Sequence, residues 1–350
     1  MAIYIQSAEH ISAQQPLGDA WFDSPIMHEK VYVRAIEPNY KEYLDPIQAR
    51  RMGKILKRAI VTARTATKNS GITMPDAIIS GTGLGCVEST EIFLGTMVES
   101  GEELLQPTHF MQSTHNAIGS LIGIDMKCHG YNSTYTQKNV SFENALLDAF
   151  LQLSEGKIKS ALVGGYDEMT PKYQLMLSRI GYWRADDENI TLKRGEETFA
   201  SETSVSFMLS SEKQKNSICR INDVEILYKP NIEELQSALN EMLKKHNFSI
   251  DDVDAVMIGA SGNKANDEIY DHNAKILFEG KPLAIYKHIF GESYTASGLG
   301  MYAAATCLKE QRIPKHLLLN GNEDINHAKT ILFYNQDEGK THALTLLTSC

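Results

Sequence analysis

The sequence predicts an α/β fold in which mixed, mostly parallel sheets are covered by helices. Apolar residues recur at helical spacing among charged residues over 45–70 and 141–154, which predicts two amphipathic helices. Short apolar runs at 76–80 and 158–163 each end in glycines, as buried strands do where the chain turns. Because strand and helix patterns of this kind alternate along the chain, we expect parallel strands joined by helices.

The first half contains the clearest helix. Residues 141–154 place apolar side chains on one face, and the pattern stops at Gly156, a residue typical of helix ends. The other elements of this half follow from the same periodicities. We expect strands at 2–7, 76–80, 132–137, 158–163 and 205–209, and helices at 45–70, 88–100, 116–123 and 141–154.

The alternation restarts after the polar stretch 210–217, which indicates a surface connection between two halves. We therefore divide the chain into units at 1–212 and 213–350. In the second unit we expect strands at 224–228, 255–258, 283–286 and 316–320, a closing hairpin at 330–334 and 342–347, and helices at 232–245, 268–277 and 295–308.

Composition excludes several classes of protein. The net charge of −10 disfavours a nucleic-acid-binding role, and the basic stretch 50–57 is interpreted as a solvated helix face. No apolar run is long enough to span a membrane, and the first residues do not form a secretory signal. Five scattered cysteines without C-x-x-C pairs favour reduced thiols in a cytoplasmic protein, with no structural metal.

The glycine-rich segment 81–85, GTGLG, follows a predicted strand and invites a comparison with dinucleotide-binding loops. Its spacing is G-x-G-x-G rather than G-x-G-x-x-G, and no convincing acidic partner for a ribose follows it. We interpret these glycines as a tight turn beneath neighbouring backbone, and we expect no cofactor.

The spacing of glycines in the middle of the chain carries a family resemblance. Gly130 begins a segment, Gly156 ends a helix, and Gly164-Gly165 end the next strand. This order and these intervals resemble the β-ketoacyl synthases of the thiolase-like superfamily, where a G-P-N segment leads to a nucleophilic cysteine. The resemblance places Asn139 at the position of that cysteine.

Other segments extend the resemblance over most of the chain. GTGLG is similar to the family's glycine turn, and Glu202 in SETSVSFML stands at a glutamate position of the family. YKHIFGESYTASGLG at 286–300 resembles K-S-N-I-G-H-x-x-x-A-A-G and retains Lys287 and Gly291. The resemblance implies two similar halves in a five-layer αβαβα fold, usually as a dimer.

The departures concern the residues of the reaction. Carried over position by position, the family's Cys-His-His set becomes Asn139, Ser261 and Glu292, while Lys287 is retained. The terminal F-G-F-G-G loop becomes 336–340, QDEGK. Gln137 takes the place of Asn139 if the register slips by two residues. His288, beside Lys287, is a further candidate for substrate binding, although we favour a partner contact or an ordinary surface histidine over that role.

These substitutions remove the chemistry of condensation. An amide is not a nucleophile that can carry an acyl chain. An ionised Glu292 would oppose the anion formed during the reaction by about 4 kcal/mol at a separation of about 4 Å and an effective dielectric of about 20. That energy corresponds to roughly a thousandfold in rate. Cys86, Cys128 and Cys307 are candidates for a relocated nucleophile, against the simpler interpretation as structural thiols.

The resemblance then implies a non-catalytic role in an acyl-carrier-protein-dependent synthase of fatty acid, polyketide or aryl polyene biosynthesis. Chain length factors of type II polyketide systems resemble ketosynthases, lack the cysteine and pair with an active ketosynthase. The implied partners are such a ketosynthase, or a second copy of this chain, and an acyl carrier protein, with an acyl-carrier-protein or coenzyme A thioester as ligand. Two alternatives stay open: an active acyltransferase or hydrolase with an unconventional residue set, and an acyl-binding homodimer.

Overall fold

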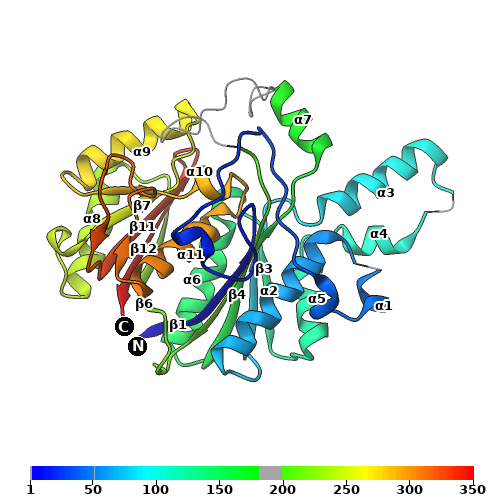
Figure 1. The fold of residues 1–350 in the computed structure, drawn as a ribbon, viewed down its shortest axis with the longest axis horizontal. Helices are drawn as coiled ribbons and strands as arrows, with labels where there is room; N and C mark the ends of the chain where they lie inside the picture. The colour runs from blue at the N-terminus through cyan, green and yellow to red at the C-terminus, as the bar shows by residue number, and fades with distance from the viewer. Residues whose placement is uncertain (1, 51, 104, 181–198) are drawn as a thin grey trace.

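Ten strands of the protein form one sheet, in the order β3-β2-β4-β5-β1-β6-β12-β11-β7-β8 (Figure 1). The computed structural model describes residues 2–50, 52–103, 105–180 and 199–350. The strands of the first half are β1 Ile3–Ile11, β2 Ala77–Gly81, β3 Tyr131–Tyr135, β4 Ser160–Asp167 and β5 Thr203–Ser210. Those of the second half are β6 Cys219–Tyr228, β7 Ala255–Ile258, β8 Leu283–Ile285, β11 Thr330–Asp337 and β12 Thr341–Ser349.

The two halves of the sheet have the same strand order. Numbered along the chain within its own half, each set of five strands is arranged 3-2-4-5-1 from the outer edge to the centre. Parallel pairs lie in the outer parts, at β3-β2-β4 and β8-β7-β11, and antiparallel pairs lie in the middle. The halves meet through a short antiparallel pairing of β1 with β6 at Ile3, Tyr4 and Ile5. The mixed α/β fold is thus confirmed, and the two expected sheets are joined into one.

Helices form three layers, each with its own buried apolar cluster. The helices are α1 Pro46–Ala49, α2 Lys54–Ser70, α3 Val87–Ser100, α4 Pro107–Gln112, α5 Ala117–Met126, α6 Ser141–Ser154, α7 Pro171–Arg179, α8 Ile232–Lys245, α9 Lys264–Leu277, α10 Lys287–Phe290 and α11 Ala296–Lys309. Short 3₁₀ turns add η1 Ala20–Phe22, η2 Tyr40–Glu42, η3 Lys138–Val140 and η4 Ile250–Asp252, and β9 Arg312–Ile313 pairs with β10 Ile325–Asn326.

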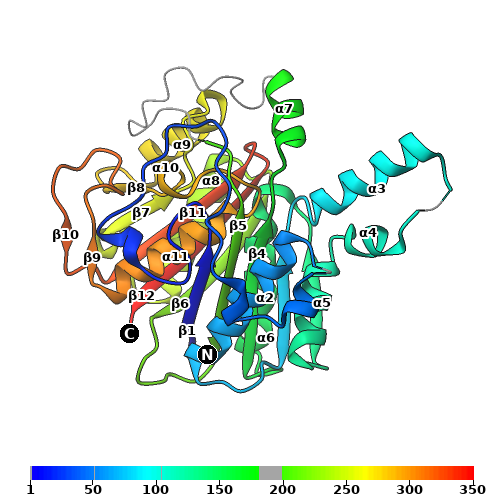
Figure 2. The same ribbon diagram turned by 45° about the vertical axis from the view of Figure 1, so that its right-hand side comes forward.

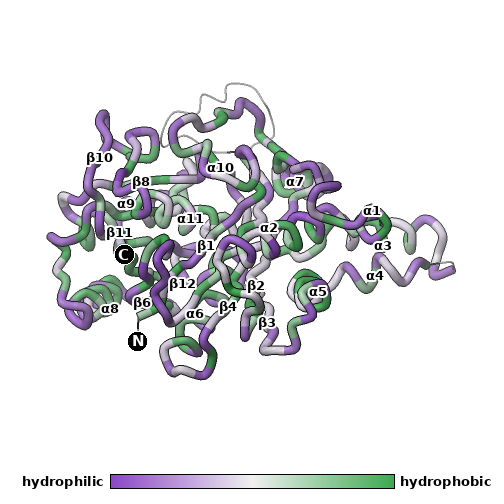
Figure 3. Tube along the Cα trace, turned by 60° about the horizontal axis from the view of Figure 1, so that its bottom comes forward, coloured by the Kyte–Doolittle hydropathy of each residue, from purple (hydrophilic) through white to green (hydrophobic). Residues whose placement is uncertain are grey.

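The layers follow from which residues share a cluster. One outer cluster joins α2 and α5 to the first-half strands, and the other joins α8 and α9 to β7, β11 and β12. The central cluster contains residues of α6 and α11 together with strands of both halves. Apolar stretches lie along these helices and strands, and hydrophilic stretches are frequent in the peripheral loops (Figure 3). This succession of helix, sheet, helix, sheet and helix is the expected five-layer arrangement.

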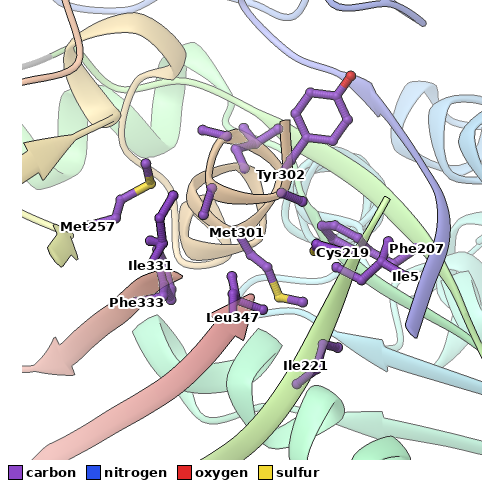
Figure 4. Packing of buried hydrophobic residues seen from close by; sticks show 14 of the residues in the cluster. Ile5, Phe207, Cys219, Ile221, Met257, Met301, Tyr302, Ile331, Phe333 and Leu347 are labelled. Atoms are coloured by element: carbon purple, nitrogen blue, oxygen red, sulfur yellow. The ribbon is translucent and has the colours of Figure 1, made fainter. Parts of the chain in front are cut away.

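Helix α11 is the centre of the molecule. Thirteen of its residues are buried, because its glycines and alanines let strands of both halves approach closely. Met301 on this helix points toward Leu347 and Ile221 of the second half, whereas Tyr302 points to another side of the helix (Figure 4). The ring of Tyr302 lies 4.7 Å from that of His10 in the first half.

Two predicted elements differ from the structure. The helix expected at 45–70 is broken into α1 and α2, because Asp45 and Pro46 start one helix and Gly53 stands at the start of the next; residue 51 lies outside the described residues. The strand expected at 316–320 makes an isolated antiparallel bridge between Leu318 and Ala284 instead of a full strand.

No helix within the described ranges is long and apolar enough to cross a bilayer. The division of the chain at residues 212 and 213 stays a prediction, which the repeated strand order supports.

Candidate functional site

Asn139 lies in η3, the turn that leads from the edge strand β3 into the buried helix α6. Its side chain is half-buried, and the amide Nδ2 donates a hydrogen bond of 2.8 Å to Oδ1 of Asp337. Asp337 ends β11 in the second half. The structure therefore brings Asn139 against the start of the turn 336–340.

Gln137, the alternative to Asn139, is exposed at the residue before η3. The backbone turns sharply at the next residue, Lys138, whose φ is 48°. Asn139 and not Gln137 thus contacts the second half.

Ser261 lies in the loop between β7 and α9 and is 8% exposed. The carboxylate of Asp267 fixes this loop, because it accepts hydrogen bonds from the backbone N–H groups of Ser261 at 2.9 Å and of Gly262 at 2.6 Å. These bonds engage the backbone of the loop. The side-chain hydroxyl of Ser261 is the group that this position can offer to a ligand.

Lys287 and Glu292 form a buried ion pair, with Nζ and Oε2 separated by 2.5 Å. Burial raises the pKa of Glu292, against the opposing positive charge of Lys287, and Asp267 raises it further. Gly291, between the two partners, has a φ of 80°, and a Cβ on it would lie 2.3 Å from that of Ser201.

His288 is 7% exposed, so the expectation of an ordinary surface histidine is wrong. It follows Lys287 in the short helix α10, and its Nε2 lies 2.8 Å from the carbonyl oxygen of His316. Its ring is thus held by the segment after β9, whereas Lys287 turns to Glu292.

The structure adds two residues to this site, Glu143 and Asn335, which are 1% and 2% exposed. Nδ2 of Asn335 donates to Oε1 of Glu143 at 2.6 Å. Burial raises the pKa of Glu143 to about 7, against the hydrogen bond from Asn335 and the charge of Lys287. A signal for Glu143 was present in the sequence, because it stands three residues before Leu146 and seven before Phe150 on the apolar face of its helix.

The site as a whole is acidic. Glu143, Glu292, Asp267 and Asp337 surround it, and Lys287 is paired with one of them. Oε2 of Glu143 and Oε1 of Glu292 are buried and have no hydrogen-bond partner among the described residues. Such a site cannot stabilise a developing anion well, because fixed negative charge in a low-dielectric interior opposes it.

The GTGLG turn at 81–85 holds an internal carboxylate. Asp167, at the end of β4, accepts hydrogen bonds from the backbone N–H groups of Gly83 at 3.0 Å and Leu84 at 2.8 Å, and from the hydroxyl of Thr82 at 3.0 Å. A row of backbone N–H groups of this kind is an anion-binding nest. Asp167 fills it, which supports the interpretation of this segment as a structural turn.

Two of the three cysteines considered as relocated nucleophiles, Cys86 and Cys307, are buried, and Cys128 is half-buried. Cys86 and Cys307 are 1% and 0% exposed, and burial raises the pKa of both thiols. Cys128 donates to the carbonyl oxygen of Pro75 at 3.3 Å. Protonated, buried thiols are poor nucleophiles. In the described part of the chain, no group of histidine, cysteine, aspartate or glutamate side chains is arranged to hold a metal ion.

Comparison with known proteins identifies the family. Residues 25–220, more than half of the chain, match the model of the β-ketoacyl synthase N-terminal domain. The chain belongs to the β-ketoacyl synthase family.

A curated relative from the same family is 3-oxoacyl-[acyl-carrier-protein] synthase 2 of Staphylococcus aureus (strain N315). It is 24% identical over 133 residues, which are 36% of this chain and 32% of the relative. The matched segment thus spans about a third of the length of this synthase.

Solved structures share the fold over the whole chain. An ishigamide ketosynthase/chain length factor superimposes with a TM-score of 0.85 at 14% identity, and covers 100% of this chain and 99% of its own. A β-ketoacyl synthase from Burkholderia phymatum gives 0.82 at 14% identity, with 100% and 99% covered. A ketosynthase in complex with its chain length factor from Xenorhabdus doucetiae gives 0.79 at 12% identity, with 100% and 98% covered. The resemblance to thiolase-like ketosynthases is confirmed at the level of fold and family.

Proposed function

We propose that this β-ketoacyl synthase homologue does not condense, and that it acts as the chain-length-factor-like partner of an active ketosynthase in fatty acid, polyketide or aryl polyene biosynthesis. The observation that carries the proposal is Asn139. It lies in η3, just before α6, at the position that the resemblance assigns to the family's cysteine, and its amide is bonded to Asp337. An amide in this place supplies no thiolate.

The surroundings of Asn139 agree with a lost reaction. Condensation needs donors that stabilise an enolate and an oxyanion. Glu292 is a carboxyl group at one histidine position, and Ser261 offers a single hydroxyl at the other. Neither group is a cation.

An exposed edge and an exposed helical arm support a partner subunit of the same fold. Strand β3 is the outer strand of the first half and pairs, among the described residues, with β2 alone. The arm, defined as α3 and α4, projects from the body of the molecule (Figures 1 and 2). Its exposed apolar residues are Ile92, Leu94, Val98, Phe110 and Met111. Apolar residues gathered on a projecting element are typical of a protein interface.

We infer that a cysteine-bearing ketosynthase covers this edge and arm, and that an acyl carrier protein delivers the chain to the pair. Several structures that share the fold are ketosynthases with chain length factors. An open strand edge gives a partner with the same fold a place to add its own edge strand.

Co-expression with ketosynthases from the same genome tests this function. A stable heterodimer is expected, and malonyl-dependent elongation should require both chains. Elongation or thioester turnover by this chain alone would contradict the proposal and favour an active enzyme with an unconventional residue set. A homodimer that retains acyl chains, shows no catalytic turnover and binds none of the ketosynthases would favour the acyl-binding alternative.

A further inference from the structure

We propose that Asn335 is a positioning residue that latches the β11–β12 hairpin onto the start of α6 and closes the candidate site against a thioester-bound acyl chain. The inference rests on the proposed function, since it takes the site around Asn139 as the counterpart of the family's acyl site. It concerns a property that the family membership does not supply, namely whether this chain can admit an acyl group at all.

Both hydrogens and the oxygen of the Asn335 side-chain amide are hydrogen-bonded. Nδ2 donates to the carbonyl oxygen of Asn139 at 2.8 Å and to Oε1 of Glu143 at 2.6 Å, which are its two hydrogens. Oδ1 accepts from the hydroxyl of Tyr270 at 2.9 Å. One side chain of β11 therefore joins η3, α6 and α9, and these elements come from both halves of the chain.

The neighbouring residues of the hairpin are tied to the same elements. Asp337 accepts from the side chain of Asn139, and Gln336 donates through Nε2 to Oδ1 of Asn266 on α9 at 2.6 Å. Three successive residues of β11 are thus hydrogen-bonded through their side chains. A segment held in this way is a fixed wall and not a mobile gate.

The latch lies among the three positions where an acyl group would react. Asn335 bonds directly to the carbonyl oxygen of Asn139 and to the carboxylate of Glu143. Burial raises the pKa of its third partner, Tyr270, and the charges of Glu292 and Glu143 raise it further. A Cβ on Gly259, two residues before Ser261, would lie 2.5 Å from the hydroxyl of Tyr270 and 2.7 Å from Oδ1 of Asn335. Tyr270 and Asn335 thus pack tightly against the strand end that leads to Ser261, and we infer that an acyl group entering here must displace them.

Hydrogen–deuterium exchange of the full-length protein tests the latch. Asn335→Ala should raise exchange at 138–143 and 336–341 together by at least about tenfold, because the two segments lose their shared partner. Lys340→Ala is the matched control, since it breaks only the exposed pair with Glu338 on the same hairpin. Wild-type exchange at 138–143 in Asn335→Ala would overturn the proposal.

Because Asn335 is buried, its loss can prevent folding, and Asp337→Ala at a half-buried position gives a second test. Asp337→Ala should also raise exchange at 138–143, and an unchanged rate would overturn the proposal.

Calorimetric titration with octanoyl-coenzyme A tests whether the latch closes the site to an acyl chain or only makes the hairpin rigid. Binding at least about tenfold tighter in a latch variant than in wild type is expected. Equal binding, or binding by neither protein, would overturn closure and leave the proposed partner function standing.

Discussion

At the scale of single residues, the site is a network of amides and carboxylates joined to one lysine. Asn139 and Glu292 could be singled out from the sequence, because fixed glycine intervals flank both positions, and their assigned roles stay predictions. Asn335 could not, since its three partners are 65 to 196 residues away and no local pattern marks it. The burial of His288 was missed for the same reason. Its charged neighbour Lys287 suggests an exposed position, but packing with distant parts of the chain buries both residues.

Restoring the sulfur alone should not restore condensation. In Asn139→Cys, the thiol would face Asp337 and lie in the field of Glu292, so its pKa should rise and little thiolate should form. We expect less than about a thousandth of the elongation rate of an active ketosynthase in a malonyl-dependent assay. Robust elongation by this single variant would show that Ser261 and Glu292 do not occupy the histidine positions.

Glu143 makes stability depend on pH. Its pKa rises from 4.5 in the unfolded chain to about 7 in the folded protein. Its favourable contribution is therefore complete below pH 4.5 and is lost as the pH rises through 7, by up to about 3 kcal/mol. In urea denaturation between pH 5 and 8, Glu143→Gln should lose less stability with rising pH than wild type.

The control is Glu155→Gln, which changes an exposed carboxylate just after the same helix. Wild-type pH dependence is expected for it. A Glu143→Gln protein with the slope of the wild type would show that folding does not raise the pKa of Glu143.

At the scale of elements, the sequence predicted what local periodicity controls. The bounds of α6, α8 and β7 agree with the expectation at both ends, because each has a strong apolar pattern and distinct ends. Asn231 and Glu234, for example, form a capping box at the start of α8. The single bridge at Leu318 could not be predicted from the sequence. It depends on how many residues of the segment 316–320 lie close enough to the strand of Ala284 to pair with it.

The arm makes a prediction that separates binding from folding. Val98 is 86% exposed, so Val98→Asp should leave the free energy of unfolding within about 0.5 kcal/mol of wild type. It should nevertheless weaken a ketosynthase heterodimer by at least about tenfold in analytical ultracentrifugation, because a charge would be buried in the interface. Tyr228→Asp, at a residue 71% exposed in the second half, is the control and should bind normally. Equal affinities for the two variants would place the interface elsewhere.

At the scale of the whole molecule, the sequence indicated two similar halves, but not how they join. The join consists of three β1–β6 residue pairs and the shared packing around α11. Neither is visible in the sequence, because the repeated strand order appears only after the strands are paired. Small and apolar residues are spread around all sides of α11, which indicates a buried helix. This pattern does not identify the strands that surround the helix.

Since α11 packs against both halves, they should unfold together. Met301 is fully buried between them, and Met301→Ala should cost about 3 kcal/mol while preserving one cooperative transition in denaturant. The exposed Met111→Ala is the comparison and should change stability little. Two separate transitions in either protein would show that the halves are independent domains.

The position of β12 in the sheet has a consequence for synthesis on the ribosome. Strand β6 pairs with β1 over three residues but with β12 over nine, and β12 is translated more than a hundred residues later. The nascent chain must therefore carry a nearly bare strand edge, open to aggregation, until residues 341–349 emerge. Chaperones that shield such edges should matter most for this protein during that interval, and fragments that stop before residue 341 should accumulate as insoluble material.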